Sequence, residues 1–177
     1  ILDAEIRILP ASPRILKHKA RIRFHLGASE VMGRIFLIER ESLKPGEKCF
    51  AQVRLEDPLV AGLGDLFVIR TYSPMRTIGG GTVLDPSPLR RRRRDKGIPA
   101  WLELLANSDM REVVEGHIRA SGPGTRLDAL RPRLNRGPDE IGALVRSTDI
   151  NQVRDLVVPF VAGTTLPALQ YMDEQVE

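Results

Sequence analysis

The sequence is poor in aromatic residues and cysteine, and these shortages exclude several kinds of site. Only 5% of its 177 residues are Phe, Trp or Tyr, which disfavours a platform that stacks single-stranded bases. The one cysteine, Cys49, cannot form an internal disulfide, and the alternating segment CFAQVRL predicts a thiol buried in a strand. The three histidines show no metal-ligand spacing, so no metal site is predicted.

The chain also lacks a membrane span and a signal peptide. No apolar run reaches the ~18–20 residues of a transmembrane helix, and no charged, apolar and small-residue sequence opens the chain. We therefore expect a cytoplasmic protein with no membrane partner. Because the chain begins without Met and already reads as a strand at Ile1, we expect a piece of a longer protein.

Nucleotide-binding motifs are missing as well, although the chain has a glycine triplet at Gly79, Gly80 and Gly81. A phosphate loop needs Lys-Ser or Lys-Thr at the start of a helix, and a dinucleotide site needs G-x-G-x-x-G between a strand and a helix. The segment GGGTVLDPSP has neither. Glycine permits close approach between backbones, so the triplet predicts tight strand packing in a β-barrel.

The first half of the chain has the pattern of a β-barrel. Short segments of alternating apolar and polar residues are separated by Pro and Gly turns, which is typical of strands in a closed barrel. The six predicted strands are EIRIL (5–9), ARIRFHL (20–26), VMGRIFLIE (31–39), CFAQVRL (49–55), DLFVIR (65–70) and TVLD (82–85). The predicted fold class is a barrel of about six antiparallel strands followed by a small α/β winged-helix domain.

The second half has helical periodicity. Apolar residues recur every three or four positions over 110–118, 127–134 and 138–145, and Asp109 precedes the first helix as its predicted cap. A strand-like run at 155–163 follows. Three short helices and a strand indicate a winged-helix module, with a small helical bundle as the alternative.

These patterns predict four regions. They are a barrel domain at 1–89, a basic linker at 90–97, a winged-helix module at 98–165 and the lead-in to a further module at 166–177. Residues 90–97 carry six basic residues and one acidic residue, whereas 98–177 carry eight basic and twelve acidic residues. An acidic half is a poor nucleic-acid binder, so we expect the helical half to be a spacer or docking element. The arginine run is either an RNA contact or a solvated linker.

The barrel half resembles a known family. DLFVIRTYSPMRTIGGGTVLDP, with FHLGASEVMGRIFLIE and PGEKCFAQVRLEDPLVAGLGD before it, is similar to the third, β-barrel domain of selenocysteine-specific elongation factors. The similarity to the last barrel of elongation factor Tu is more distant. The loop from Thr71 to Met75 is longer than in the Tu-like pattern and contains Tyr-Ser-Pro, which favours the selenocysteine branch.

The resemblance implies that the barrel lies against the T-stem of an aminoacyl-tRNA, here selenocysteinyl-tRNA. It also implies the ribosome as a partner, and a selenoprotein mRNA hairpin bound through further modules. The glycine triplet would brace the turn that meets RNA phosphates. As the alternative, Arg70 and Arg76 pair with carboxylates across the barrel. The predicted RNA-binding residues are Arg70, Tyr72, Ser73, Arg76, Thr77, Arg90, Arg91, Arg92, Arg93 and Arg94.

We predict no catalytic residue and no cofactor in this chain. The phosphate loop and guanine-recognition segments of translation GTPases are missing from the sequence, so GTP and Mg²⁺ are expected in a GTPase domain of the longer parent. The alternative functions are another factor like elongation factor Tu, and a winged-helix DNA-binding regulator. The acidic balance of residues 98–177 disfavours the regulator.

Overall fold

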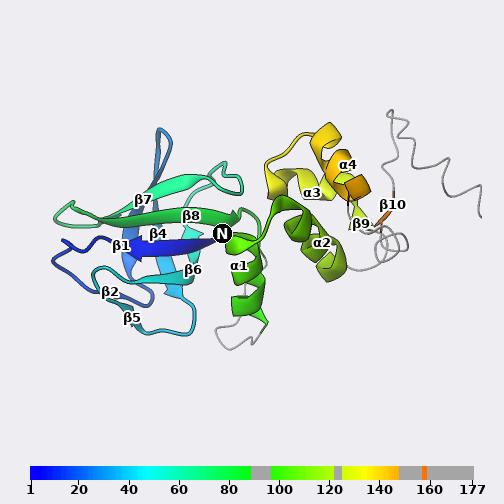
Figure 1. Cartoon of the computed structure of the whole chain (residues 1–177). Coiled ribbons are helices and arrows are strands. Elements are labelled where there is room, and N and C mark those ends of the chain that lie inside the picture. Colours follow the sequence, from blue (N-terminus) through cyan, green and yellow to red (C-terminus); the bar gives the residue numbers. More distant parts are fainter. Residues whose placement is uncertain (89–96, 122–124, 148–156, 159–177) are drawn as a thin grey trace, which may run out of the picture. The chain divides into compact units, whose positions relative to one another are not determined.

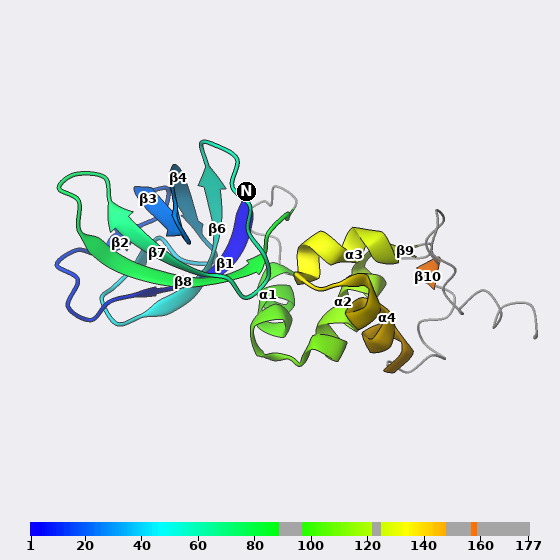
Figure 2. The ribbon, with the colours of Figure 1, turned by 90° about the horizontal axis from the view of Figure 1, so that it is seen from above.

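The computed structural model describes residues 1–88, 97–121, 125–147 and 157–158 (Figures 1 and 2). By its internal contacts the chain divides into two compact units, Ile1–Asn107 and Ser108–Glu177. The helix that begins at Ile98 therefore groups with the barrel, whereas the sequence prediction assigns it to the second domain. The domain limits expected from the sequence stay predictions.

Six strands of the first unit form a closed antiparallel barrel in the order β1-β6-β4-β3-β7-β8. Figure 1 shows β1 (blue) beside β8 (green), the pair that closes the barrel. This architecture confirms the predicted fold class of a six-stranded antiparallel barrel followed by a small domain with helices. The strands are β1 (Leu2–Ile8), β3 (Arg21–Leu26), β4 (Ser29–Leu37), β6 (Lys48–Leu55), β7 (Leu66–Thr71) and β8 (Thr77–Asp85).

Alternation along the strands separates the core from the outer surface. In β3, Ile22 and Phe24 are buried, while Arg21 and Arg23 lie on the outside. The Phe24 ring stacks on Phe67 of β7 with a centroid distance of 4.5 Å. Each large apolar side chain removed from water stabilises the fold by roughly 1.5–3 kcal/mol, so this alternation fixes the register of the barrel.

Gln52 of β6 is an exception to the rule that polar residues of the strands are exposed. It lies between core residues in the sequence, on the outer side of the strand, and is nevertheless only 3% exposed. Its Nε2 donates to Asp3 Oδ1 at 3.0 Å, and its Oε1 accepts from Arg54 Nε at 3.1 Å. A buried polar group is tolerated when its hydrogen bonds are made. Sequence alternation predicts the outward direction of Gln52 but not its burial.

The glycine triplet lies in β8, between β1 and β7. A Cβ atom at any of the three glycines would clash with a carbonyl oxygen of β1 or β7. At Gly81 it would meet the Glu5 carbonyl oxygen and lie 2.8 Å from Phe67 Cζ. The closing strand therefore passes its neighbours at a separation that side chains would prevent.

Two further elements belong to the first unit. A short antiparallel pair, β2 (Leu16–Lys17) and β5 (Ser42–Leu43), adds Leu16 and Leu43 to the core. Helix α1 (Ile98–Asn107) contacts β8 and β1. Helix α1 is absent from the three helices predicted after the barrel, because its first turn has no acidic residue and its last turn no basic residue to mark the helix ends.

The second unit contains the three helices that were predicted, α2 (Met110–Ser121), α3 (Leu127–Leu134) and α4 (Pro138–Ser147). The Glu112 N–H donates to Asp109 Oδ1 at 2.9 Å, so the predicted helix cap is confirmed. The large apolar residues buried on these helices, within the described ranges, are Val113, Val114, Ile118, Leu130, Leu134 and Ile141.

A parallel pair, β9 (Thr125–Arg126) and β10 (Val157–Val158), completes the described part of this unit. The rest of the predicted strand at 155–163 and the lead-in at 166–177 lie outside the described residues. In the described ranges, every helix is too short or too polar to cross a membrane.

Candidate nucleic-acid interface

The loop that joins β7 to β8 is held by its own hydrogen bonds. The Thr71 N–H donates to the Arg76 carbonyl oxygen at 2.9 Å, and the Arg76 N–H donates to Thr71 Oγ1 at 3.0 Å. The Thr71 hydroxyl donates to the Pro74 carbonyl oxygen, and the Ser73–Pro74 peptide bond is cis. Residues 72–76 are exposed, so the loop presents their side chains to solvent from a fixed base.

Strand β3 brings two more arginines to the base of this loop. Arg23 is directly opposite Arg70 in the β3–β7 register. The guanidinium carbons of Arg21 and Arg23 lie 4.9 and 5.6 Å from the centroid of the Tyr72 ring, within the range of cation–π contacts. We call Arg21, Arg23, Arg70 and Arg76, together with Tyr72, the arginine face.

Two members of the arginine face lack a carboxylate partner. Within the described ranges, no Asp or Glu oxygen lies within 4.0 Å of the guanidinium groups of Arg70 and Arg76. Arg70 Nη1 lies 4.0 Å from Met75 Sδ, which is a weak acceptor. Both cations are therefore available to an external anion, and the described residues contain none of the carboxylate pairs that the alternative interpretation requires.

The other two arginines are paired with glutamates. Arg21 donates to both oxygens of Glu56, at 3.0 and 2.9 Å, and this hydrogen bonding raises the pKa of Arg21 above its ordinary value. Arg23 Nη1 donates to Glu30 Oε1. Four arginines against two glutamates leave the face cationic, which is the electrostatic requirement for binding phosphates.

The predicted RNA-binding residues fall into two groups. The structure brings five of them together at the end of β7, in the following loop and at the start of β8: Arg70, Tyr72, Ser73, Arg76 and Thr77. Thr77 is opposite Arg70 in the β7–β8 register. The predicted run from Arg90 to Arg94 lies outside the described residues.

Arg21 and Arg23 are the members of the face that the sequence prediction misses. Alternation places them on the outside of their strand, and that signal is present in the sequence. The sequence does not reveal that β3 pairs with β7, because the two strands are far apart in the chain. Strand order is a long-range property, so the periodicity of one strand does not reveal its neighbour.

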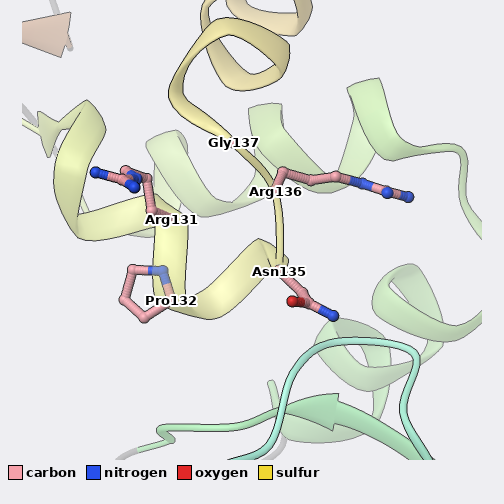
Figure 3. A pocket seen from close by; sticks show the side chains of 5 residues that line it. All are labelled: Arg131, Pro132, Asn135, Arg136 and Gly137. Carbon is pink, nitrogen blue, oxygen red and sulfur yellow. The ribbon is translucent and has the colours of Figure 1, made fainter.

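A second surface feature lies in the helical unit, at the turn between α3 and α4. Its cavity of about 550 Å³ is lined by Arg131, Pro132, Asn135, Arg136 and Gly137 (Figure 3). Figure 3 shows the Arg131 and Arg136 side chains pointing to opposite sides. Glu140 lies 4.0 Å from Arg136 and accepts the Gly137 N–H at 3.1 Å. The two arginine side chains therefore do not converge on a common ligand, and the Glu140 carboxylate already binds the backbone of the turn.

The described ranges contain no cluster of three or more His, Cys, Asp or Glu residues that could hold a metal ion. Cys49 is half-buried, and burial raises its pKa to about 11. The thiol is therefore protonated at neutral pH and a poor nucleophile.

Comparison with known proteins identifies the barrel. The family described as selenocysteine-specific elongation factor, beta-barrel domain, matches residues 3–90. A selenocysteine-specific elongation factor of Desulfomicrobium baculatum is 33% identical over 124 residues, which are 70% of this chain and 19% of that protein. One of Haemophilus influenzae is 25% identical over 107 residues, 60% of this chain and 16% of that protein. The chain thus spans less than a fifth of the length of these relatives. Through its β-barrel domain, the chain belongs to the family of selenocysteine-specific elongation factors.

Proposed function

We propose that this chain is the C-terminal portion of a selenocysteine-specific translation elongation factor and that its barrel binds selenocysteinyl-tRNA. The observation that carries the proposal is the arginine face, where Arg70 and Arg76 are exposed or half-buried and have no carboxylate partner in the described ranges. The family membership and the names of both relatives support it.

The chemistry of the face suits the T-stem of a tRNA. A-form RNA is recognised mainly by its shape, its phosphates and its 2′-hydroxyl groups, and arginine is well matched to phosphate geometry. In this proposal Arg70 and Arg76 bind backbone phosphates, and Tyr72 is held by Arg21 and Arg23 against the same stem. Phosphate contacts position a duplex without reading its sequence, so the choice of tRNA depends on other parts of the factor.

We further propose that the helical unit links the barrel to modules that bind the selenoprotein mRNA hairpin, for selenocysteine insertion at UGA on the ribosome in the cytoplasm. The order α2, β9, α3, α4, β10 supports a winged-helix module. We assign GTP and Mg²⁺ to a GTPase domain of the parent, because the sequence of this chain has no phosphate loop. In this proposal the chain itself is not an enzyme.

The test is aminoacyl-tRNA binding by the full-length factor with Arg76→Ala, measured over a range of salt concentrations. Loss of one phosphate contact should weaken binding and lower the slope of log K against log salt by about one, with little dependence on stem sequence. Arg7→Ala is the matched control, because Arg7 is an exposed arginine on β1, which β8 separates from β7. Equal affinities and slopes for both variants and the wild type would remove Arg76 from the interface.

A further inference from the structure

Glu30 occupies an unusual place on the barrel surface, among three cationic or ionisable side chains. It lies near the start of β4, directly opposite His25 in the β3–β4 register. Its Oε1 accepts a hydrogen bond from Arg23 Nη1, and its Oε2 lies 3.6 Å from His25 Nε2. Because Arg23 is the register partner of Arg70, this carboxylate borders the arginine face.

The surroundings of Glu30 stabilise a negative charge. The hydrogen bond from Arg23 is the largest cause that lowers the pKa of Glu30 below its ordinary value. The charges of Arg23, His25 and Arg70 lower this pKa further, against a partial desolvation that raises it. At neutral pH the site therefore holds one carboxylate anion.

The Glu30 carboxylate leaves several nearby polar nitrogens without a hydrogen bond. Arg23 Nε, His25 Nε2 and Arg70 Nε are each buried without a hydrogen-bond partner. The 3.6 Å separation between His25 Nε2 and Glu30 Oε2 is too long for a hydrogen bond. Buried polar nitrogens without partners are rare and unfavourable. Two of these three are guanidinium donors, so they indicate a site for an anion placed differently from the Glu30 carboxylate.

We propose that Glu30 fills, in the free protein, the place that one RNA backbone phosphate takes in the complex, so that Glu30 weakens RNA binding. The inference rests on the proposed RNA-binding function and adds an internal competitor to it. A backbone phosphodiester shares one negative charge between two non-bridging oxygens, so it can replace the Glu30 carboxylate charge for charge. Small movements of Arg23 and Arg70 would bring their Nε donors to those oxygens. Glu30 can leave without disturbing the core, because its side chain is 40% exposed.

A second glutamate on the same side of the barrel differs in its bonding. Glu56 is held through both of its oxygens by Arg21, at 3.0 and 2.9 Å. Such a bidentate pair has little unused donor capacity, whereas the neighbours of Glu30 leave two guanidinium donors and one imidazole nitrogen without a partner. The competitor role is therefore specific to Glu30.

The test compares Glu30→Gln with Glu5→Gln in the chain of residues 1–177. Glu5 is the matched control, because it is also paired with a cation, Lys48 at 2.9 Å, but lies on β1, which is separated from β7 by β8. The probe is a fluorescein-labelled 12-base-pair RNA duplex, and the readout is anisotropy between 50 and 300 mM KCl. Thermal melting of each variant checks that the barrel is intact.

Glu30→Gln should bind the duplex about 3- to 10-fold more tightly than the wild type, with a salt slope steeper by about one phosphate. Glu5→Gln should change the affinity less than about 2-fold, since screening weakens a distant surface charge. The gain from Glu30→Gln should vanish when Arg23→Gln is present, because the vacated site then lacks its main donor.

The outcomes separate this inference from the proposed function. Binding that depends on Arg70 but is equal for Glu30→Gln and Glu5→Gln would overturn the competitor role and leave RNA binding by the face in place. Binding that is indifferent to Arg70→Gln, or absent in both the wild type and Glu30→Gln, would overturn both.

Discussion

The two compact units of this chain use their arginines differently. The barrel leaves Arg70 and Arg76 without a carboxylate partner in the described ranges, at the end of β7 and in the exposed loop that follows it. In the helical unit, two of the arginines pair with glutamates four residues away, at 3.6 and 4.0 Å. Pairs at this spacing stabilise helical segments by a few tenths of a kcal/mol. Arg70 and Arg76 of the barrel are thus open to a ligand, whereas Arg119 and Arg136 stabilise the helices whose glutamates they pair with.

The acidic charge of the second half is not spread evenly along the chain. Residues 108–147 carry seven basic and six acidic residues, while residues 148–177 carry one basic and five acidic residues. The acidity that disfavours nucleic-acid binding therefore belongs to the last thirty residues and not to α2, α3 and α4. The prediction that the helical unit is a spacer therefore rests on the pairing of its arginines as much as on net charge.

The largest difference between the units is expected for the same substitution at two glycines. Gly81→Ala should destabilise the barrel by about 1–3 kcal/mol, because the new Cβ would meet the Glu5 carbonyl oxygen and the Phe67 ring. Gly142→Ala should stabilise α4 by up to about 1 kcal/mol, because alanine favours a helix. Its Cβ would lie 3.3 Å from Arg146 Nη1, the mobile end of a long side chain.

Urea denaturation measures these effects, followed by the reactivity of Cys49 for Gly81→Ala and by circular dichroism at 222 nm for Gly142→Ala. A Gly81→Ala protein as stable as the wild type would mean that β8 can move away from β1 and β7 to accept a side chain. A destabilised Gly142→Ala protein would mean that Arg146 cannot move. Gly80→Val should also damage the barrel, since its Cβ would meet the Phe67 carbonyl oxygen.

These glycines illustrate what the sequence can and cannot predict. The triplet predicts close strand packing, but the sequence does not identify the carbonyl of Glu5 as the contact. Helix α2 is predicted together with its cap because the relevant residues lie within one turn of each other. The site is predicted only where it is local: the loop after β7 carries its own signal, whereas Arg23 and Glu30 join the site through strand pairings that periodicity does not encode.

A smaller difference is expected in RNA binding. Arg70→Gln with Arg76→Gln should weaken binding of residues 1–177 to an RNA hairpin about 10-fold at 100 mM KCl and lower the salt slope by about two phosphates. Arg131→Gln with Arg136→Gln removes the same charge from the helical unit and should change affinity less than about 2-fold, because those side chains diverge and one is paired. Fluorescence anisotropy measures both. A larger loss of affinity for Arg131→Gln with Arg136→Gln would make the α3–α4 turn the principal RNA contact. It would refute the assignment of RNA binding to Arg70 and Arg76.

The smallest effect is a dependence of barrel stability on pH through Cys49, the one cysteine of the chain. Burial raises the pKa of the folded thiol to about 11, from an ordinary value of 9.0. The folded barrel keeps a proton that the unfolded chain releases, so the thiol's contribution is fully present below pH 9 and is lost as the pH rises towards 11. Alkylation by iodoacetamide should show a midpoint near pH 11 in the native protein and near pH 9 in concentrated urea, and Cys49→Ala should remove this part of the loss of stability at high pH.

Because the second unit contains no cysteine, thiol reactivity at pH 8 reports the unfolding of the barrel, whereas ellipticity at 222 nm reports mainly the helices. If the units unfold independently, their urea midpoints should differ, and Gly81→Ala should move the thiol curve and only that part of the ellipticity curve that comes from α1 of the barrel unit. Superimposable curves in the wild type and in Gly81→Ala would show instead that the two units unfold as one.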